Sequence, residues 1–253
     1  MFEIPRPYSL RIERIAIPMA EGRNSRRVLH IAMSISKEFN SDITAITVRD
    51  ELRDIVWTDK ITVITNAYKE GLSKNVKVIP KIVTGRNIRD ALLRELNSHN
   101  YDLVLIASEK NSMLRHFSFG RLSEYILKNS KSPSAIVSVK YPNYPYKKIY
   151  VPLSETINTR SAVSFALHLK RNTGASLVFE DLRSFDVKSK HRFTYLFDYM
   201  NELIEAFGGD ISMIRGNPER SIQDAVNRTC ENDKPDAMVL GIKKNDNNKV
   251  RIN

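Results

Sequence analysis

The sequence contains a single cysteine, Cys230, among 253 residues. An internal disulfide is therefore excluded, and so is a thiolate metal site, because no second cysteine is available as a ligand. Long apolar runs are also lacking: none approaches the ~20 residues that cross a bilayer. The N-terminus has no apolar segment typical of a secretion signal. These absences predict a cytoplasmic protein without a transmembrane segment.

Glycine is scarce, with 9 residues, and the glycine-dependent motifs of many enzymes are missing. There is no G-x-G-x-x-G, no Walker A sequence and no G-x-S-x-G. The histidines lack metal-ligand spacing; they are His30, His99, His116, His168 and His191. Neighbouring carboxylates at Asp50–Glu51 and Glu180–Asp181 could line a crevice, but the sequence shows no catalytic partner for them. We therefore predict no metal site and no enzyme activity.

Basic residues exceed acidic ones, which gives a formal net charge of +11. A surface of this charge could attract nucleic acid, anionic lipid or a phosphorylated ligand. The basic residues are scattered, however, and no RNP, zinc-finger or helix-turn-helix pattern accompanies them. We expect a solvated basic surface. A small anion remains an alternative ligand, and we do not expect nucleic acid as a partner.

What the sequence does contain is an internal repeat. Residues 14–48 correspond to residues 148–182, which lie 134 positions later. Six positions are identical in the two copies: Ile15, Pro18, Glu21, Asn24, Arg26 and Ala32 match Ile149, Pro152, Glu155, Asn158, Arg160 and Ala166. Each copy has the pattern of a strand, a loop, a helix and a second strand. Such a unit places its loop at the carboxyl end of a parallel strand, where open α/β sheets bind ligands.

Apolar runs and amphipathic segments alternate along both copies. In the first half this pattern predicts strands at 13–19, 42–48, 76–83, 101–107 and 135–139. Helices are predicted from an N-cap at Asn24 or Ser25 to about Phe39, then at 51–73, 88–96 and 120–129. We expect the 51–73 helix to place Trp57, Ile61, Ile64 and Tyr68 on one side. In the second half strands are predicted at 148–153, 175–181, 210–215 and 236–241, with helices at 158–172, 187–207 and 219–232.

Parallel strands joined by helices cross over right-handedly, so the alternation predicts an α/β fold. We expect two doubly wound parallel-sheet domains, each three-layered and Rossmann-like, with the second truncated after its fourth strand. The predicted division is a leader at 1–12, a first domain at 13–140, a linker at 141–147 and a shortened second domain at 148–253. The residues after 241 are too few for another crossover helix and strand.

Several stretches carry a resemblance to the universal stress protein family. They are IAIPMAEGRNSRRVLHIA and IYVPLSETINTRSAVSFA, then YDLVLIASEK and PDAMVLGIKK, then FGRLSEYILKNSKSPSAIVSV. The resemblance covers about residues 12–140 and 147–245. Domains of that family open with a strand ending V-P-x-D and carry a loop G-x-x-G-x9-G-[ST] after the fourth strand. In members that bind ATP, the Asp faces the adenosine and the loop wraps the phosphates.

The resemblance places the family's ligand positions on specific residues of this chain. The Asp position is Ala20 in the first domain and Ser154 in the second. The glycine and hydroxyl positions of the loop fall on Ala107, Lys110, Gly120 and Arg121 in the first domain, and on Gly241 and Lys244 in the second. Val48 completes the crevice of the first domain. Glycines let backbone amides approach an anion closely, but of these positions only Gly120 and Gly241 are glycines. The resemblance therefore implies that both nucleotide sites are degenerate.

The resemblance implies a non-catalytic stress-response or regulatory module that acts through a protein partner or as a homo-oligomer. Family dimers commonly join through their fifth strands, and residues 134–139 supply that strand here. Two alternatives stay open. One is a sensor of ATP, AMP or another anion, with Lys110, Arg115 and Arg121 supplying charge in the 107–121 loop. The other is a soluble regulatory domain pair associated with a membrane transporter.

Overall fold

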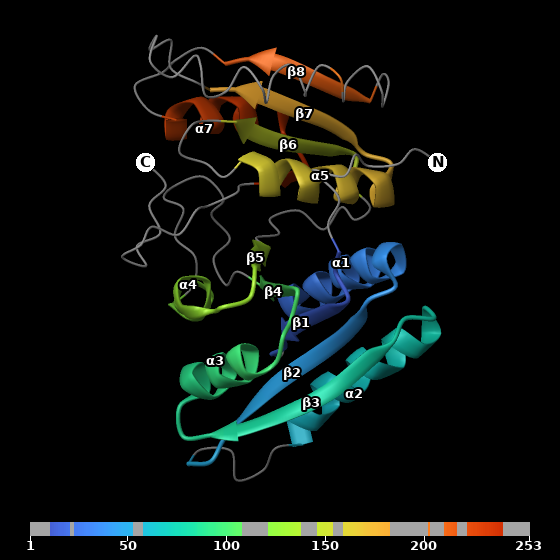
Figure 1. Ribbon diagram of the computed structural model, residues 1–253, viewed down its shortest axis with the longest axis vertical. Coiled ribbons are helices and arrows are strands. Elements are labelled where there is room, and N and C mark those ends of the chain that lie inside the picture. The colour runs from blue at the N-terminus through green and yellow to red at the C-terminus, as the bar shows by residue number, and fades with distance from the viewer. Residues whose placement is uncertain are drawn as a thin grey trace. The chain divides into compact units, whose positions relative to one another are not determined.

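The computed structural model describes residues 11–20, 23–52, 58–107, 121–137, 146–153, 159–182, 202, 210–216 and 222–239. The chain divides into two compact units, one comprising Arg11–Pro142 and the other containing the described residues from Tyr146 onward. Each unit is built on its own parallel sheet, and Figure 1 shows the strands of both. The predicted α/β architecture with two parallel sheets is therefore confirmed.

The first unit alternates strands and helices throughout its described residues. Its elements are β1 (Arg14–Pro18), α1 (Arg23–Phe39), β2 (Asp42–Asp50), α2 (Thr58–Ser73), β3 (Val78–Gly85), α3 (Ile88–Ser98), β4 (Leu103–Ala107), α4 (Arg121–Asn129) and β5 (Ser134–Val137). The strands pair in the order β3-β2-β1-β4-β5, and all pairs are parallel. The chain therefore runs from β1 outward to β3 and then returns to β4 on the other side of β1. The switch point of the strand order lies between β1 and β4.

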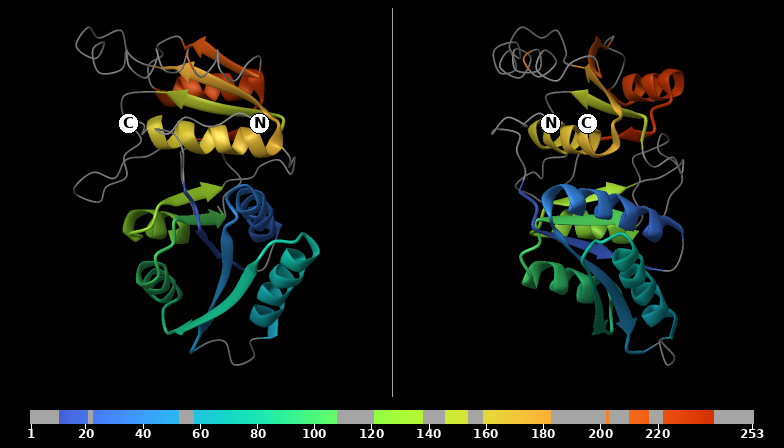
Figure 2. Two further views of the ribbon diagram at one scale, coloured as in Figure 1. Left: turned by 45° about the vertical axis from the view of Figure 1, so that its right-hand side comes forward. Right: turned by 90° about the vertical axis from the view of Figure 1, so that its right-hand side faces the viewer.

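Helices cover both faces of this sheet. Helices α1 and α2 pack on one face, and α3 and α4 pack on the other (Figure 2). Beneath α3 and α4 lies a core cluster of buried side chains: Ala16, Ile46, Val48, Ala91, Leu92, Leu96, Tyr101, Val104, Ile106 and Ile126. Burial of this apolar surface is the main force that holds the two helices on the sheet.

Helix α2 contacts the sheet through smaller residues than the sequence pattern predicts. Ile61 and Tyr68 are 41% and 42% exposed, whereas Ala67 and Gly71 are buried. A Cβ atom on Gly71 would lie 2.5 Å from Cγ2 of Val78 and 2.8 Å from the carbonyl oxygen of Val76. The close approach of α2 to β3 therefore requires small residues, Ala67 and Gly71, at the contact. The larger Ile61 and Tyr68 side chains are partly exposed to solvent instead. Ile64, the third residue of the predicted side, is buried, and Trp57 lies outside the described residues.

The second unit repeats this plan with a shorter sheet. Its described elements are β6 (Lys148–Leu153), α5 (Thr159–Thr173), β7 (Ser176–Asp181), β8 (Ile211–Arg215), α7 (Ile222–Asp233) and β9 (Ala237–Met238). The strand order is β8-β7-β6-β9, again parallel, which matches the first sheet without its fifth strand. The predicted helix at 187–207 falls almost wholly outside the described residues.

The 134-residue offset of the repeat also relates the starts of α3 and α7. Helix α7 begins at Ile222 and α3 at Ile88, and 222 − 88 = 134, the offset found in the sequence. The start of α1 differs from the prediction, because the helix begins at Arg23, before both predicted N-caps. The Ser25 hydroxyl instead accepts a hydrogen bond from the backbone N–H of Ala20, at 3.1 Å. That contact holds the loop after β1 against the first turn of α1.

Candidate functional site

The carboxyl ends of β1 and β4 form the edge at which the sequence predicts a ligand crevice. Pro18 pairs with Ile46, and the backbone N–H of Met19 donates to the Ile46 carbonyl at 2.7 Å. By this register Ala20 lies level with Val48 on β2. Ala107 ends β4, which adjoins β1. The structure thus brings Ala20, Val48 and Ala107 to one edge of one sheet, as expected for a site at the switch point of an open α/β sheet.

Ala20 occupies the position at which the family resemblance predicts a ligand-facing carboxylate. Its side chain is exposed, and its backbone N–H is used by the Ser25 hydroxyl. Ser25 is 7% exposed and presents only a hydroxyl, which can accept a hydrogen bond but carries no charge. Among the described residues that follow β1, neither Ala20 nor Ser25 supplies an acidic side chain.

Val48 and Ala107 have structural roles in the fold, which the sequence pattern alone could not distinguish from contact with a ligand. The Val48 side chain is 7% exposed and belongs to the core cluster beneath α3 and α4. The carbonyl oxygen of Ala107 accepts a hydrogen bond from the Ser123 hydroxyl at 3.0 Å. This bond ties the end of β4 to the first turn of α4, whose backbone begins at Arg121. The N-terminus of α4 therefore lies at the end of β4.

The remaining predicted positions lie outside the described residues. They are Lys110 and Gly120 in the first unit, and Ser154, Gly241 and Lys244 in the second. Ser154 directly follows Leu153, the last residue of β6, so its place in the chain corresponds to that of Ala20 after β1. The assignment of ligand contacts to these residues stays a prediction.

The carboxylates at the ends of the second strands are engaged in local contacts in the first unit. Asp50 is 7% exposed, and its Oδ1 accepts the backbone N–H of Leu52 at 2.9 Å, which shapes the turn after β2. Glu51 extends to Arg86, with 3.7 Å between Oε2 and Nε. Asp50 thus contacts a backbone N–H, whereas Glu51 lies near an arginine.

In the second unit, Glu180 lies inside the fold, where it contacts two hydroxyl groups. The residue is 5% exposed on β7. Its carboxylate accepts from the Tyr150 hydroxyl on β6, and from Oγ1 of Thr229 on α7 at 2.9 and 3.0 Å. Burial and the Glu180 carboxylate raise the pKa of Tyr150 far above its usual value, so the phenol remains a donor. These partners satisfy a carboxylate that would otherwise be costly to bury.

A glycine next to this cluster makes the packing possible. A Cβ atom on Gly216 would lie 2.5 Å from Cδ2 of Leu182 and 2.9 Å from Oε1 of Glu180.

The sequence places Glu180 at a strand end, but its inward direction depends on Tyr150 and Thr229, which are 30 and 49 residues away. Pattern reasoning missed this cluster because its members share no local spacing.

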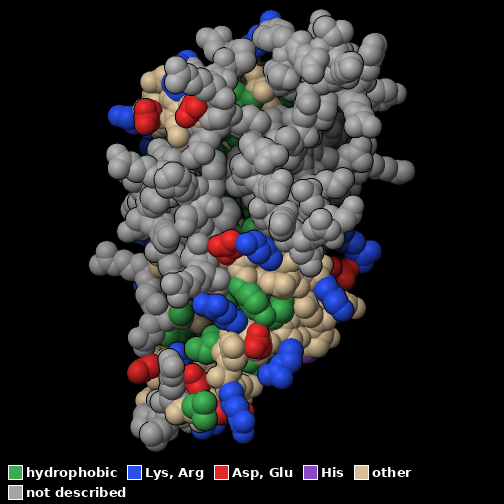
Figure 3. Space-filling model, turned by 90° about the vertical axis from the view of Figure 1, so that its left-hand side faces the viewer, with side chains coloured by type: hydrophobic (Ala, Val, Ile, Leu, Met, Phe, Trp, Pro, Cys, Tyr) green, Lys and Arg blue, Asp and Glu red, His purple; other side chains and the backbone are tan. Residues whose placement is uncertain are grey.

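The described residues contain neither a cluster of metal ligands nor a membrane-spanning helix. Within the described ranges no group of three or more His, Cys, Asp or Glu side chains could hold a metal ion. Over those ranges no helix is long and apolar enough to span a bilayer. On the face drawn in Figure 3, the described Lys and Arg side chains are interspersed with acidic and apolar ones. That distribution matches the scattered basic residues of the sequence.

Comparisons with known proteins point to one family. The model of the universal stress protein family matches residues 11–138. None of the curated proteins compared with the chain matches it. Among solved structures, a universal stress protein from Pseudomonas aeruginosa is 11% identical over 92% of this chain and 83% of its own, with a TM-score of 0.65. One from Archaeoglobus fulgidus is 16% identical over 90% of this chain and 84% of its own, with a TM-score of 0.61. At these identities the similarity to solved structures demonstrates a common fold.

Proposed function

Because the chain belongs to the universal stress protein family, we propose that it is a non-catalytic regulatory or stress-response protein whose nucleotide site in the first domain is degenerate. The observation that carries this proposal is Ala20. It lies at the tip of β1, level with Val48 and beside the end of β4, where the family's nucleotide-binding members carry a carboxylate. Its backbone N–H is occupied by Ser25, and its side chain is a methyl group.

Without a carboxylate at position 20, one hydrogen bond between a nucleotide and a charged acceptor is lost. A hydrogen bond to a charged acceptor contributes about 1.5–3 kcal/mol, so its removal lowers nucleotide affinity by roughly tenfold or more. The sequence adds a second loss, since Ala107 and Lys110 replace glycines of the phosphate loop. A Cβ atom at these positions obstructs the approach of backbone amides to an anion. Both changes act in the same direction, away from nucleotide binding.

A sensor of a different anion is the second candidate, and one sequence feature favours it. Lys110, Arg115 and Arg121 concentrate positive charge in the stretch that follows β4. Arginine binds phosphate through two donors, which could replace part of a lost backbone cradle. Association with a membrane transporter, a protein partner and a dimer formed through β5 stay predictions of the family resemblance.

Calorimetry on the full chain with ATP and AMP tests the proposal. The unaltered protein should show no tight binding of either nucleotide. Ala20→Asp should raise affinity by about tenfold or more, since it returns the missing acceptor, while the uncharged Ala20→Asn should give a much smaller gain. Tight ATP binding by the unaltered chain would contradict the degenerate site. Tight binding of inorganic phosphate, unaffected by either variant, would favour the anion sensor instead.

A further inference from the structure

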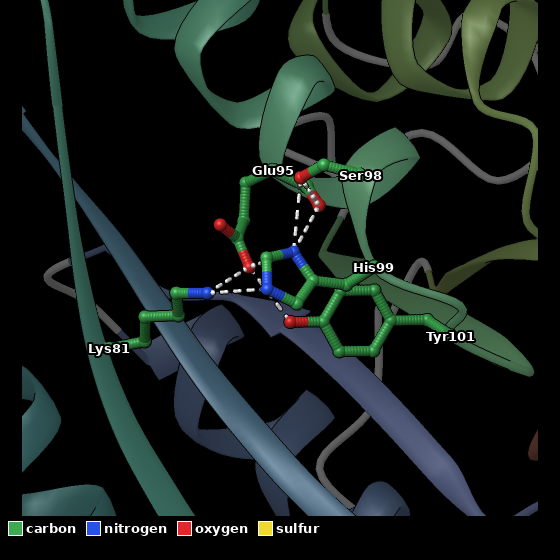
Figure 4. A network of polar contacts seen from close by, with 5 residues as sticks. All are labelled: Lys81, Glu95, Ser98, His99 and Tyr101. Atoms are coloured by element: carbon green, nitrogen blue, oxygen red, sulfur yellow. Dashed lines mark hydrogen bonds and ion pairs between the residues drawn. The ribbon is translucent and has the colours of Figure 1, made fainter.

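A polar network surrounds the C-terminal end of α3 in the first unit, away from the predicted crevice. Figure 4 shows its members, which come from three parts of the fold. Lys81 lies on β3, Glu95 and Ser98 on the last turn of α3, His99 at its C-cap, and Tyr101 just before β4. The Glu95 side chain is 8% exposed, whereas Lys81 and His99 reach solvent with 33% and 47% of theirs.

Glu95 is the shared acceptor of this network. Its Oε1 lies 2.6 Å from Nζ of Lys81 and 2.9 Å from the Tyr101 hydroxyl. Burial and the Glu95 carboxylate raise the pKa of Tyr101 to about 12, so the phenol donates at all ordinary pH values. Nδ1 of His99 lies 3.2 Å from the same Glu95 oxygen. Lys81 and His99 therefore both have access to one carboxylate.

The contact between Lys81 and His99 fixes the proton position on the imidazole. Nζ of Lys81 lies 3.2 Å from Nε2 of His99. An ammonium group has only donors, so Nε2 must accept, and the proton of the neutral ring sits on Nδ1. Nδ1 faces the Ser98 hydroxyl at 3.0 Å and the Glu95 carbonyl oxygen at 3.2 Å, both of which can accept that proton. These contacts match the Nδ1–H tautomer of the imidazole.

The first unit contains a second histidine with the opposite arrangement. Nε2 of His30 on α1 contacts the Glu70 carboxylate on α2, so this nitrogen must carry a proton. His30 thus gains a favourable charge pair on protonation. His99 instead would direct a new Nε2–H group at the ammonium of Lys81. The two histidines should respond to acid in structurally different ways.

We propose that protonation of His99 switches the partner of Glu95 and releases Lys81 from α3. Two cationic donors cannot stay 3.2 Å apart, so one must leave. His99 follows directly on α3, and its Nδ1 already lies 3.2 Å from Oε1 of Glu95. Lys81 has a flexible four-carbon stem, whereas the imidazole of His99 is held by the Ser98 hydroxyl and the Glu95 carbonyl oxygen, so Lys81 is the one that moves. Two further titratable or charged residues lie near this site, Tyr101 and Arg14. The ring centroid of Tyr101 lies 5.9 Å from that of His99, and the charge of Arg14 partly opposes the rise in the pKa of Tyr101.

Release of Lys81 would loosen β3, which is the edge strand of the described sheet. Lys81 is the strand's charged link to α3, and its neighbour Pro80 has no N–H. The Lys77 carbonyl bonds to β2, so by alternation Pro80 faces the outer edge, where a missing donor discourages pairing with other strands. The proposed switch therefore acts on the mobility of β3 rather than on exposure of a new edge for pairing.

The tautomers provide the first test. Two-bond ¹H–¹⁵N correlation spectra of the full chain should show neutral His99 with its proton on Nδ1, and neutral His30 with its proton on Nε2. His30 serves as the internal comparison, because it belongs to the same folded unit. Observation of neutral His99 in the Nε2–H form would overturn the proposal, since Lys81 could not then donate to that nitrogen.

Hydrogen exchange provides the second test, with acidification from about pH 7.5 to about pH 5.5 spanning the usual titration of histidine. After correction for intrinsic rates, β3 amides should exchange about fivefold faster at the lower pH in the unaltered chain, as expected for loss of one ion pair. His99→Gln should remove this response, and Lys81→Met should give fast exchange at both pH values. Equal responses in the unaltered chain and His99→Gln, with both folded by circular dichroism, would overturn the switch.

Discussion

Asp102 and Asp236 make the same pair of hydrogen bonds in the two units. Oδ2 of Asp102 accepts the backbone N–H groups of Glu13 and Arg14, both at 2.9 Å. Oδ2 of Asp236 accepts those of Lys147 and Lys148, at 2.8 and 3.0 Å. Since 236 − 102 = 134, the two aspartates are equivalent in the repeat. Each fixes the start of the first strand of its unit next to the start of the fourth.

Removal of this clamp should destabilise the unit that contains it. We expect Asp102→Ala to lower the free energy of unfolding by about 1–2 kcal/mol, because two backbone donors lose a charged acceptor. Asp102→Asn keeps one carbonyl oxygen and should cost less. Denaturant unfolding followed by circular dichroism measures both. If Asp102→Ala and Asp102→Asn were equally harmless, the clamp would have no energetic role.

Gly71 offers a second test, because its packing and its helix propensity act in opposite directions. Alanine is favoured over glycine in a helix interior by ~1 kcal/mol. At this position, however, a Cβ atom would meet Val78 at 2.5 Å and backbone at 2.8 Å. We expect Gly71→Ala to destabilise the protein by about 1–3 kcal/mol, as overpacking does. Asn66→Ala, at an exposed site of the same helix, is the matched control and should be neutral or stabilising.

The repeat explains why so much of the fold could be predicted from the sequence. The alternation of elements and the parallel order follow from local periodicity, which both copies display. Even a backbone detail is shared: Asn40 after α1 and Gly174 after α5 are 134 residues apart and have φ values of 55° and 69°. Glycine and asparagine are the residues that tolerate this left-handed conformation after a helix.

Other features could not be predicted because they depend on contacts between distant segments. The apolar pattern of α2 places Ile61, Ile64 and Tyr68 on one side, but the buried residues of the helix are Ile64, Ala67 and Gly71, because α2 lies close to β3. The inward direction of Glu180 likewise depends on residues of another strand and another helix. At the candidate site, the sequence placed Ala20, Val48 and Ala107 correctly at one edge, since strand ends follow from periodicity. Their roles in hydrogen bonding and core packing needed the structure.

Glu70 leads to a prediction about pH. Burial raises the pKa of this carboxyl, but His30, Lys74 and Arg26 outweigh burial and bring it below the usual 4.5. A depressed pKa contributes stability that is present above the unfolded value and is lost as pH falls through the folded value. Glu70→Gln should therefore destabilise the protein at neutral pH by about 1 kcal/mol or less, and the difference should disappear as the pH falls through the lowered pKa of the folded state.

The control for Glu70 is another carboxylate that pairs with a lysine on the surface. Glu124 lies 2.5 Å from Nζ of Lys128, four residues later on α4, and its side chain is 48% exposed against 15% for Glu70. Glu124→Gln should change stability less than Glu70→Gln at neutral pH, because a single exposed pair is screened by solvent. Urea unfolding of the three proteins across the pH range gives the comparison. A larger effect at Glu124 would contradict the special role of the Glu70 cluster.

Cys230 is expected to be an unreactive thiol at physiological pH. Burial and the nearby Glu180, Asp233 and Glu231 carboxylates raise its pKa from 9.0 to about 11. Since the thiolate is the nucleophile, a rise of this size lowers reactivity near pH 8 by roughly 100-fold. Alkylation by iodoacetamide should accelerate with each pH unit up to about 11. Glu180→Gln should make the folded thiol react faster, because one of the charges that oppose the thiolate is removed. Denatured protein supplies the rate of an ordinary cysteine, and a folded chain that reacted at that rate would show that Cys230 lacks this environment.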